Sequence, residues 1–144
     1  MGFLTRLFSG HSDGRTDSKD AGAALFGRTI LVLESSLTIC RVIELMLTET
    51  GANALTFATK EEFLTGLSST APDIAILSVT ELGDDVYSFV EQIKSQFPST
   101  KIVLLTDISN PIGLATASQR GVDEVSLKPF NAVKLLGSLS QLVQ

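Results

Sequence analysis

The feature that most constrains this sequence is a regular alternation of short apolar runs with amphipathic helical patterns, beginning at Thr29. The first run, residues 29–33, reads TILVL, and such apolar, β-branched runs are typical of strands buried on both faces. Four similar runs follow, and a stretch with helical spacing separates each from the next. The predicted strands are residues 29–33, 53–57, 73–79, 101–105 and 122–127.

Residues with helix-capping preferences mark several boundaries between these elements. Gly51 follows the first helical pattern, and glycine tolerates the positive φ with which helices often end. Thr59, with Glu62 three residues later, has the pattern of a capping box, and Asn131 opens the last helical pattern. Five strands alternating with five helices predict an α/β, flavodoxin-like fold: a doubly wound, five-stranded parallel sheet with helices on both faces.

The sequence before the first predicted strand has a different composition and divides in two. Residues 11–27 are rich in Gly, Ser and Asp and are predicted to be a flexible linker before a domain of residues 28–144. Residues 1–10 carry an apolar cluster with the spacing of one side of a short helix. The cluster consists of Phe3, Leu4, Leu7 and Phe8.

Three interpretations stay open for residues 1–10. The helical spacing suits docking into a groove of a partner protein, which is the favoured interpretation. A weak membrane attachment is least favoured, because peripheral helices usually have a longer apolar face or several basic residues and this segment has only Arg6. The third interpretation is a segment without ordered structure.

Composition excludes several function classes. The net charge is −5, with no run of Lys and Arg, which argues against binding nucleic acid. The single cysteine, Cys40, cannot assemble a disulfide framework or a zinc site within the chain. The single histidine, His11, lies in the predicted linker, which excludes a histidine general base inside the fold. No apolar stretch is long enough to span a bilayer and no secretory signal is present, so we expect a cytoplasmic protein.

Four polar residues end or closely follow four of the predicted strands: Glu34, Ser78, Thr106 and Lys128. The carboxyl ends of parallel strands meet at one edge of the sheet, so these side chains should lie together. A charge in a partly buried pocket is costly unless it is paired. We therefore predict an ion pair between Glu34 and Lys128. The two hydroxyl side chains should be hydrogen-bonded close by.

The order of these motifs resembles the response-regulator receiver domain of bacterial two-component signalling. In that family an acidic pair follows the first strand, an acceptor aspartate ends the third, Thr or Ser ends the fourth, and Lys-Pro-Phe follows the fifth. The corresponding residues here are Glu34, Ser35, Ser78, Thr106 and Lys128. The resemblance covers about residues 28–144 and implies a CheY-like sheet with strand order 2-1-3-4-5.

The resemblance also implies which chemistry is lost. In the family the acidic pair and the acceptor aspartate hold magnesium, and that aspartate is phosphorylated. Here only Glu34 is acidic, and a serine hydroxyl at position 78 cannot replace an ionised carboxylate as the nucleophile. Val125 stands where receivers commonly carry the aromatic residue that reports phosphorylation. We therefore expect a degenerate pseudo-receiver with no catalytic residue, no cofactor, no enzymatic activity, and lost or weak magnesium binding.

The segment after Ser78 is predicted to be an acidic loop. Glu81, Asp84 and Asp85 could be proposed as substitute metal ligands. A solvated acidic loop that favours the start of the next helix is the simpler interpretation. No metal ligand is therefore assigned.

The leading hypothesis is a phosphorylation-independent adaptor for protein partners in a bacterial signalling or localisation pathway. The C-terminal part carries few charges, and in receivers the surface of helix 4, strand 5 and helix 5 is a common site for dimers and partners. Candidate contact residues there are Ile112, Val133 and Leu136, although they could instead pack on the sheet. Two alternatives stay open: a phosphorelay receiver with a non-standard acceptor, and a sensor that binds an anion or small molecule at the former pocket.

Overall fold

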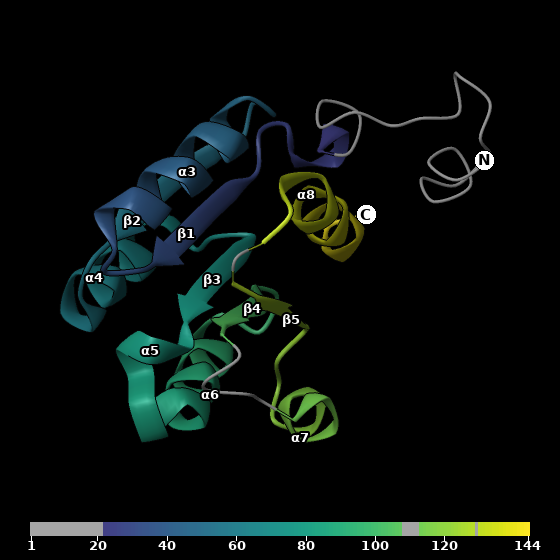
Figure 1. Cartoon of the computed structure of the whole chain (residues 1–144). Helices are drawn as coiled ribbons and strands as arrows, with labels where there is room; N and C mark the ends of the chain where they lie inside the picture. Colours follow the sequence, from purple (N-terminus) through teal and green to yellow (C-terminus); the bar gives the residue numbers. More distant parts are fainter. Residues whose placement is uncertain (1–21, 108–112, 129) are drawn as a thin grey trace.

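The computed structural model describes residues 22–107, 113–128 and 130–144. A five-stranded parallel sheet runs through the domain in the order β2-β1-β3-β4-β5 (Figure 1). Its strands are β1 (Thr29–Leu33), β2 (Asn53–Phe57), β3 (Ile74–Ser78), β4 (Lys101–Thr106) and β5 (Glu124–Leu127). The flavodoxin-like class and the strand order predicted from the sequence are confirmed.

Helices cover both faces of this sheet. The described α-helices are α3 (Leu37–Thr48), α4 (Lys60–Thr70), α5 (Val79–Leu82), α6 (Val86–Gln96), α7 (Leu114–Gln119) and α8 (Ala132–Leu142), with 3₁₀ turns η2 (Ala23–Leu25) and η3 (Gly83–Asp85). The side chains of Thr59 and Asn131 each accept a hydrogen bond from the backbone three residues later, so both predicted caps are confirmed. Gly51 has a φ of 86°, as its position after α3 predicts.

One helix was not predicted. The segment after β3 forms α5 and η3, where the sequence indicated a loop, so the described residues contain six α-helices instead of five. The reason is the spacing of Val79 and Leu82, which lie three residues apart and are 1% and 4% exposed. Both pack into the core with the apolar side of α6, and one helical turn brings them to the same side.

The sheet separates two apolar cores. Leu31, Leu33, Ala75 and Leu77 face the core beneath α4, α5, α6 and α7. Residues one position away on the same strands face the second core, beneath α3 and α8, and Figure 1 shows these two helices on the same side of the sheet. Both faces of β1 and β3 are therefore covered, as their continuous apolar runs require.

The apolar packing extends before residue 28, the predicted start of the domain. Leu25 in η2 is fully buried and packs in the core that α3 and α8 cover. The part of the predicted linker in residues 11–21, and the whole of residues 1–10, lie outside the described residues. Among the residues that are described, no helix is both long and apolar enough to cross a membrane.

Candidate functional site

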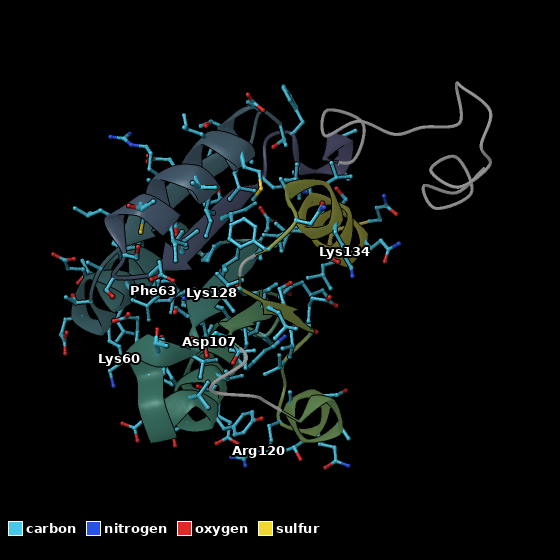
Figure 2. All side chains as sticks on the ribbon, viewed as in Figure 1. Lys60, Phe63, Asp107, Arg120, Lys128 and Lys134 are labelled. Atoms are coloured by element: carbon cyan, nitrogen blue, oxygen red, sulfur yellow. The ribbon has the colours of Figure 1, made fainter. Side chains whose placement is uncertain are left out.

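The predicted cluster forms at the carboxyl ends of the strands. Glu34 follows β1, Ser78 ends β3, Thr106 ends β4, and Lys128 follows β5. The backbone N–H of Lys128 donates a 2.7 Å hydrogen bond to the Thr106 carbonyl, which continues the β4–β5 pairing and sets the position of the lysine. In Figure 2, Lys128 and Asp107 lie toward the middle of the molecule, whereas Arg120 and Lys134 lie at its outer helices.

An ion pair between Lys128 and Glu34 is at the centre of this site. The Lys128 Nζ atom lies 2.6 Å from Glu34 Oε1, and the two side chains are 13% and 3% exposed. This pair was predicted from the sequence and is confirmed. The same Nζ atom also donates to Ser78 Oγ at 2.9 Å. One ammonium group therefore bridges the ends of β1 and β3.

The second carboxylate oxygen and the backbone carbonyl of Glu34 also accept hydrogen bonds. Its Oε2 atom accepts a 3.0 Å hydrogen bond from the backbone N–H of Ser36, at the start of α3. Cys40, one turn further along that helix, donates from Sγ to the Glu34 carbonyl oxygen at 3.0 Å. Burial raises the pKa of the Cys40 thiol, and the nearby Glu34 carboxylate raises it further, because both disfavour a second negative charge.

The hydroxyl of Ser78 is enclosed. Ser78 is 0% exposed, and its Oγ atom contacts Thr80 Oγ1 at 2.9 Å in addition to the lysine ammonium. Thr80 was not identified from the sequence. Its position depends on α5, which turns the chain back over the end of β3. The same turn brings the carboxylate of Glu81 to Ser35, whose hydroxyl donates a hydrogen bond to Glu81 Oε2.

Thr106 completes the predicted cluster. It is 2% exposed, and its Oγ1 donates to the carbonyl of Asp107 at 3.5 Å, a long contact. Asp107 and Lys128 line one cavity beside α3. Glu34, Ser78 and Lys128 contact one another, as the convergence of strand ends predicted. The described hydrogen bonds to Ser36 and Thr80 required the folded chain.

The donor set does not fit a magnesium ion. Magnesium prefers oxygen ligands in near-octahedral geometry, commonly including one or two carboxylates. The Glu34 carboxylate has one oxygen on the Lys128 ammonium, and the Glu81 carboxylate is hydrogen-bonded to Ser35. No group of three or more acidic, histidine or cysteine side chains converges on a metal-binding geometry within the described part of the chain.

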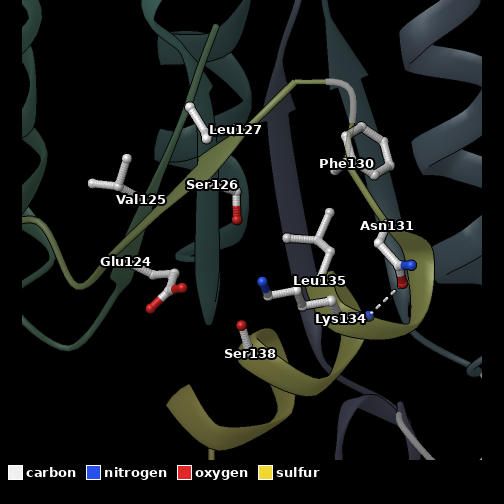
Figure 3. A pocket seen from close by; sticks show the side chains of 9 residues that line it. All are labelled: Glu124, Val125, Ser126, Leu127, Phe130, Asn131, Lys134, Leu135 and Ser138. Atoms are coloured by element: carbon white, nitrogen blue, oxygen red, sulfur yellow. Dashed lines mark hydrogen bonds between the residues drawn. The ribbon is translucent and has the colours of Figure 1, made fainter. Parts of the chain in front are cut away.

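The face formed by α7, β5 and α8 is the other candidate region. Val125 is half-buried and lines a cavity of about 360 Å³ between β5 and α8. Figure 3 shows the amino group of Lys134 directed into this space, which Glu124 and Ser126 also line. Ile112, a predicted contact residue of this face, lies outside the described residues.

Leu136 was predicted on a partner-binding surface, and the structure corrects this. It is 1% exposed and packs in the core with Leu25 and Ile30. Val133 is partly buried against the same core. The apolar stripe of α8 faces inward, where Leu135, Leu136 and Leu139 pack in the same core as the buried residues of α3. It therefore serves the core more than the surface.

Comparison with known proteins agrees with this architecture. The family model described as "Response regulator receiver domain" matches residues 30–140. Protein PilG of Pseudomonas aeruginosa is 28% identical over 115 residues, which cover 78% of this chain and 85% of PilG. The DNA-binding transcriptional regulator NtrC of Klebsiella pneumoniae is 27% identical over 100 residues, which cover 69% of this chain but only 21% of NtrC.

Solved structures show the same fold. A response regulator from Thermotoga maritima superimposes with a TM-score of 0.73 at 21% identity, covering 82% of this chain and 98% of the other. The chemotaxis response regulator CheY4 of Vibrio cholerae gives 0.71 at 24% identity, covering 81% and 98%. At these identities the likeness establishes the fold alone. The family match, however, spans most of the chain, and this chain therefore belongs to the response regulator receiver domains of two-component signalling.

Proposed function

We propose that this receiver domain is a pseudo-receiver, which acts as a phosphorylation-independent adaptor for other proteins. The observation that carries the proposal is the position of the Lys128 ammonium, which lies 2.6 Å from Glu34 Oε1 and 2.9 Å from Ser78 Oγ. In the family, the corresponding lysine is the counter-ion of the phosphoryl group. Here the lysine is neutralised within the protein.

The chemistry of Ser78 supports this proposal. A serine hydroxyl becomes a nucleophile when a neighbouring base removes its proton. Its nearest cationic neighbour, Lys128, instead donates to Oγ, which withdraws electron density from that oxygen. Ser78 is also 0% exposed, so an incoming phosphodonor would first have to displace the start of α5. We propose that neither phosphorylation nor any other enzymatic reaction takes place at this position.

Magnesium binding is proposed to be weak or lost for the same reason. The family set of three acids is reduced to Glu34, and this carboxylate is already paired with an ammonium group. A divalent cation would have to break this buried ion pair and would gain one carboxylate ligand in exchange. Repulsion between the cation and Lys128 adds to the cost.

The remaining function of such a domain is binding, and we propose protein partners. The net charge of −5 and the absence of a basic run favour proteins over nucleic acid. The face of α7, β5 and α8 is one candidate surface, because the cavity between β5 and α8 offers Glu124 and Lys134 beside apolar side chains. A homodimer through this face is one form that the interaction could take.

The test is phosphorylation with a small phosphodonor. The full chain is incubated with acetyl phosphate and magnesium, and its intact mass is measured alongside a receiver domain that has all three acids. We expect the control to gain one phosphoryl group and this chain to gain none. A phosphoryl adduct on the wild-type chain would overturn the proposal and would support a phosphorelay receiver with a non-standard acceptor.

The variant Ser78→Asp sharpens this test. It returns the acceptor carboxylate but leaves position 35 as serine, so we expect no efficient phosphorylation in the same assay. The double variant Ser35→Asp with Ser78→Asp returns all three acids and is the matched comparison. Efficient phosphorylation of the single variant would mean that the pocket has lost only its acceptor.

A further inference from the structure

Helix α3 is apolar on two sides, and only one side packs on the sheet. Cys40, Ile43 and Leu47 are buried against the core. On another side of the same helix, Val42 is 48% exposed and Leu45 is 59% exposed. These two residues are three positions apart and so are neighbours on the helix surface. Packing against the sheet therefore does not account for the apolar residues on this second side of α3.

The exposed side of α3 continues into a hollow. A cavity of about 390 Å³ lies next to it, lined by Thr38, Ile39, Val42, Asp107, Lys128 and Phe130. The two α3 residues Ile39 and Val42 form its apolar wall together with the ring of Phe130, which is partly buried. We call this cavity, with the exposed Leu45 next to Val42, the α3 groove. It runs from the middle of α3 to the chain that follows β5.

The described chain begins beside the loop that follows α3. A Cβ atom on Gly22 would lie 2.5 Å from Thr50 Cγ2 and 3.6 Å from Leu136 Cδ2. Gly22 therefore sits where the loop after α3 meets α8. From Thr50 to Val42 the distance along the helix axis is about 12 Å, at 1.5 Å per residue.

The length of the preceding sequence matches this distance. The apolar residues at the start of the chain end at Phe8, and residues 9–21 connect them to Gly22. Thirteen residues rich in Gly and Ser have a root-mean-square span of about 20 Å. A tether somewhat longer than the separation of two sites favours their contact, and it gives an effective concentration on the order of millimolar.

We propose that the α3 groove is the docking site of this chain's own N-terminal segment, with Phe3, Leu4, Leu7 and Phe8 covering Val42 and Leu45. The spacing of these four residues is that of a helix presenting one apolar side, the pattern used in helix-in-groove recognition. The contact is intramolecular, and a partner that binds α3 must first displace it. The proposal is independent of whether Ser78 can be phosphorylated.

The size of the groove favours this occupant over a second copy of the chain. A stable interface between two proteins buries about 1,200–2,000 Å² in total. The groove offers two half-exposed side chains and one hollow, which is a small part of that area. A tethered segment needs far less contact, because the linker has already removed most of the entropic cost of association.

Methyl NMR of the full chain tests the proposal. We expect nuclear Overhauser effects between the rings of Phe3 or Phe8 and the methyl groups of Val42 and Leu45. The double variant Phe3→Ser with Phe8→Ser should abolish these effects and shift both methyl resonances. Leu37 is the internal control: it is 82% exposed on the same helix, about 140° around the axis from Val42, and its resonances should not move.

A second pair of variants tests the groove itself. Leu45→Ser should lose the protection of residues 1–10 against hydrogen exchange, whereas the matched Leu37→Ser should keep it. Both side chains are exposed, so neither change should unfold the domain. Absence of the Overhauser effects in the wild-type chain would overturn the proposal. Effects that weaken on dilution would also overturn it, and would assign the groove to a second copy.

Discussion

The ion pair at the carboxyl ends of the strands is buried, whereas the ion pair at their amino ends is in contact with solvent. Lys128 and Glu34 are 13% and 3% exposed. Arg28 and Asp73, which precede β1 and β3, are 41% and 37% exposed and lie 3.3 Å apart. Both pairs involve β1, at its opposite ends: the buried pair links β1 to the chain after β5, and the exposed pair links it to the start of β3. The comparison therefore contrasts a buried with an exposed ion pair on one strand.

The two ion pairs also differ in their other hydrogen bonds and in the access of water to them. Asp73 also accepts a 2.9 Å hydrogen bond from the Thr29 backbone, and Arg28 donates to the Val143 carbonyl at 3.0 Å. The exposed pair therefore links the starts of β1 and β3 to the end of α8. Water can replace either partner there. At the buried end, the Glu34 side chain is 3% exposed, so water has little access to its carboxylate, and each partner is necessary to the other.

The largest expected effect follows from breaking the buried pair. Lys128→Met leaves the Glu34 carboxylate buried without its cation, and breaking such a pair typically costs about 3–5 kcal/mol. We expect the free energy of unfolding, measured by urea titration, to fall by this amount. The double variant Lys128→Met with Glu34→Leu should recover most of the loss, because no uncompensated charge then remains. A double variant as unstable as the single one would contradict this account.

A much smaller effect is expected at the amino ends. Arg28→Met removes a cation from a pair of which more than a third is exposed, and such pairs contribute about 0.2–1 kcal/mol. The loss should shrink further in high salt, because exposed charges are screened. The same urea titration at low and high salt measures it. A loss as large as that of Lys128→Met would show that burial does not distinguish the two ends.

The smallest expected effect is a dependence of stability on alkaline pH. Burial and Glu34 raise the pKa of the Cys40 thiol above its ordinary value of 9.0. The unfolded chain then loses this proton at lower pH than the folded chain does, so the stabilisation is complete below pH 9.0 and is lost as pH rises through the folded pKa. Cys40→Ala should flatten the decline in unfolding free energy above that pH. An unchanged decline would assign it to other groups.

Much of the site could be predicted from the sequence, because strand ends in a parallel sheet converge. Glu34, Ser78, Thr106 and Lys128 were located by this rule, and the pairing of Glu34 with Lys128 followed from the cost of an unpaired buried charge. The contact between Ser78 and Thr80 was missed. It depends on α5, a helix of four residues in a segment whose acidic composition indicated a loop.

One residue of the predicted partner-binding surface is buried, and an exposed apolar pair elsewhere was not predicted. Sequence patterns assigned partner-binding character to Leu136 in α8, which is buried, and did not assign it to any residue of α3. Val42 and Leu45 are exposed instead. Helical spacing shows that residues share a side, but it does not show which of two apolar sides will face the sheet.

The resemblance to receiver domains implied the strand order, and the sequence by itself determined the fold class and the end of the sheet at which polar residues gather. These depend on the local period of apolar residues and on the handedness of the crossovers, which every segment carries independently. Only the tertiary structure decided that one ammonium group bridges two strands, that Ser78 is enclosed, and that α3 keeps an apolar side exposed. The physical reason is that burial and hydrogen-bond partners depend on contacts between segments that are distant in the sequence. A local sequence pattern does not predict these contacts.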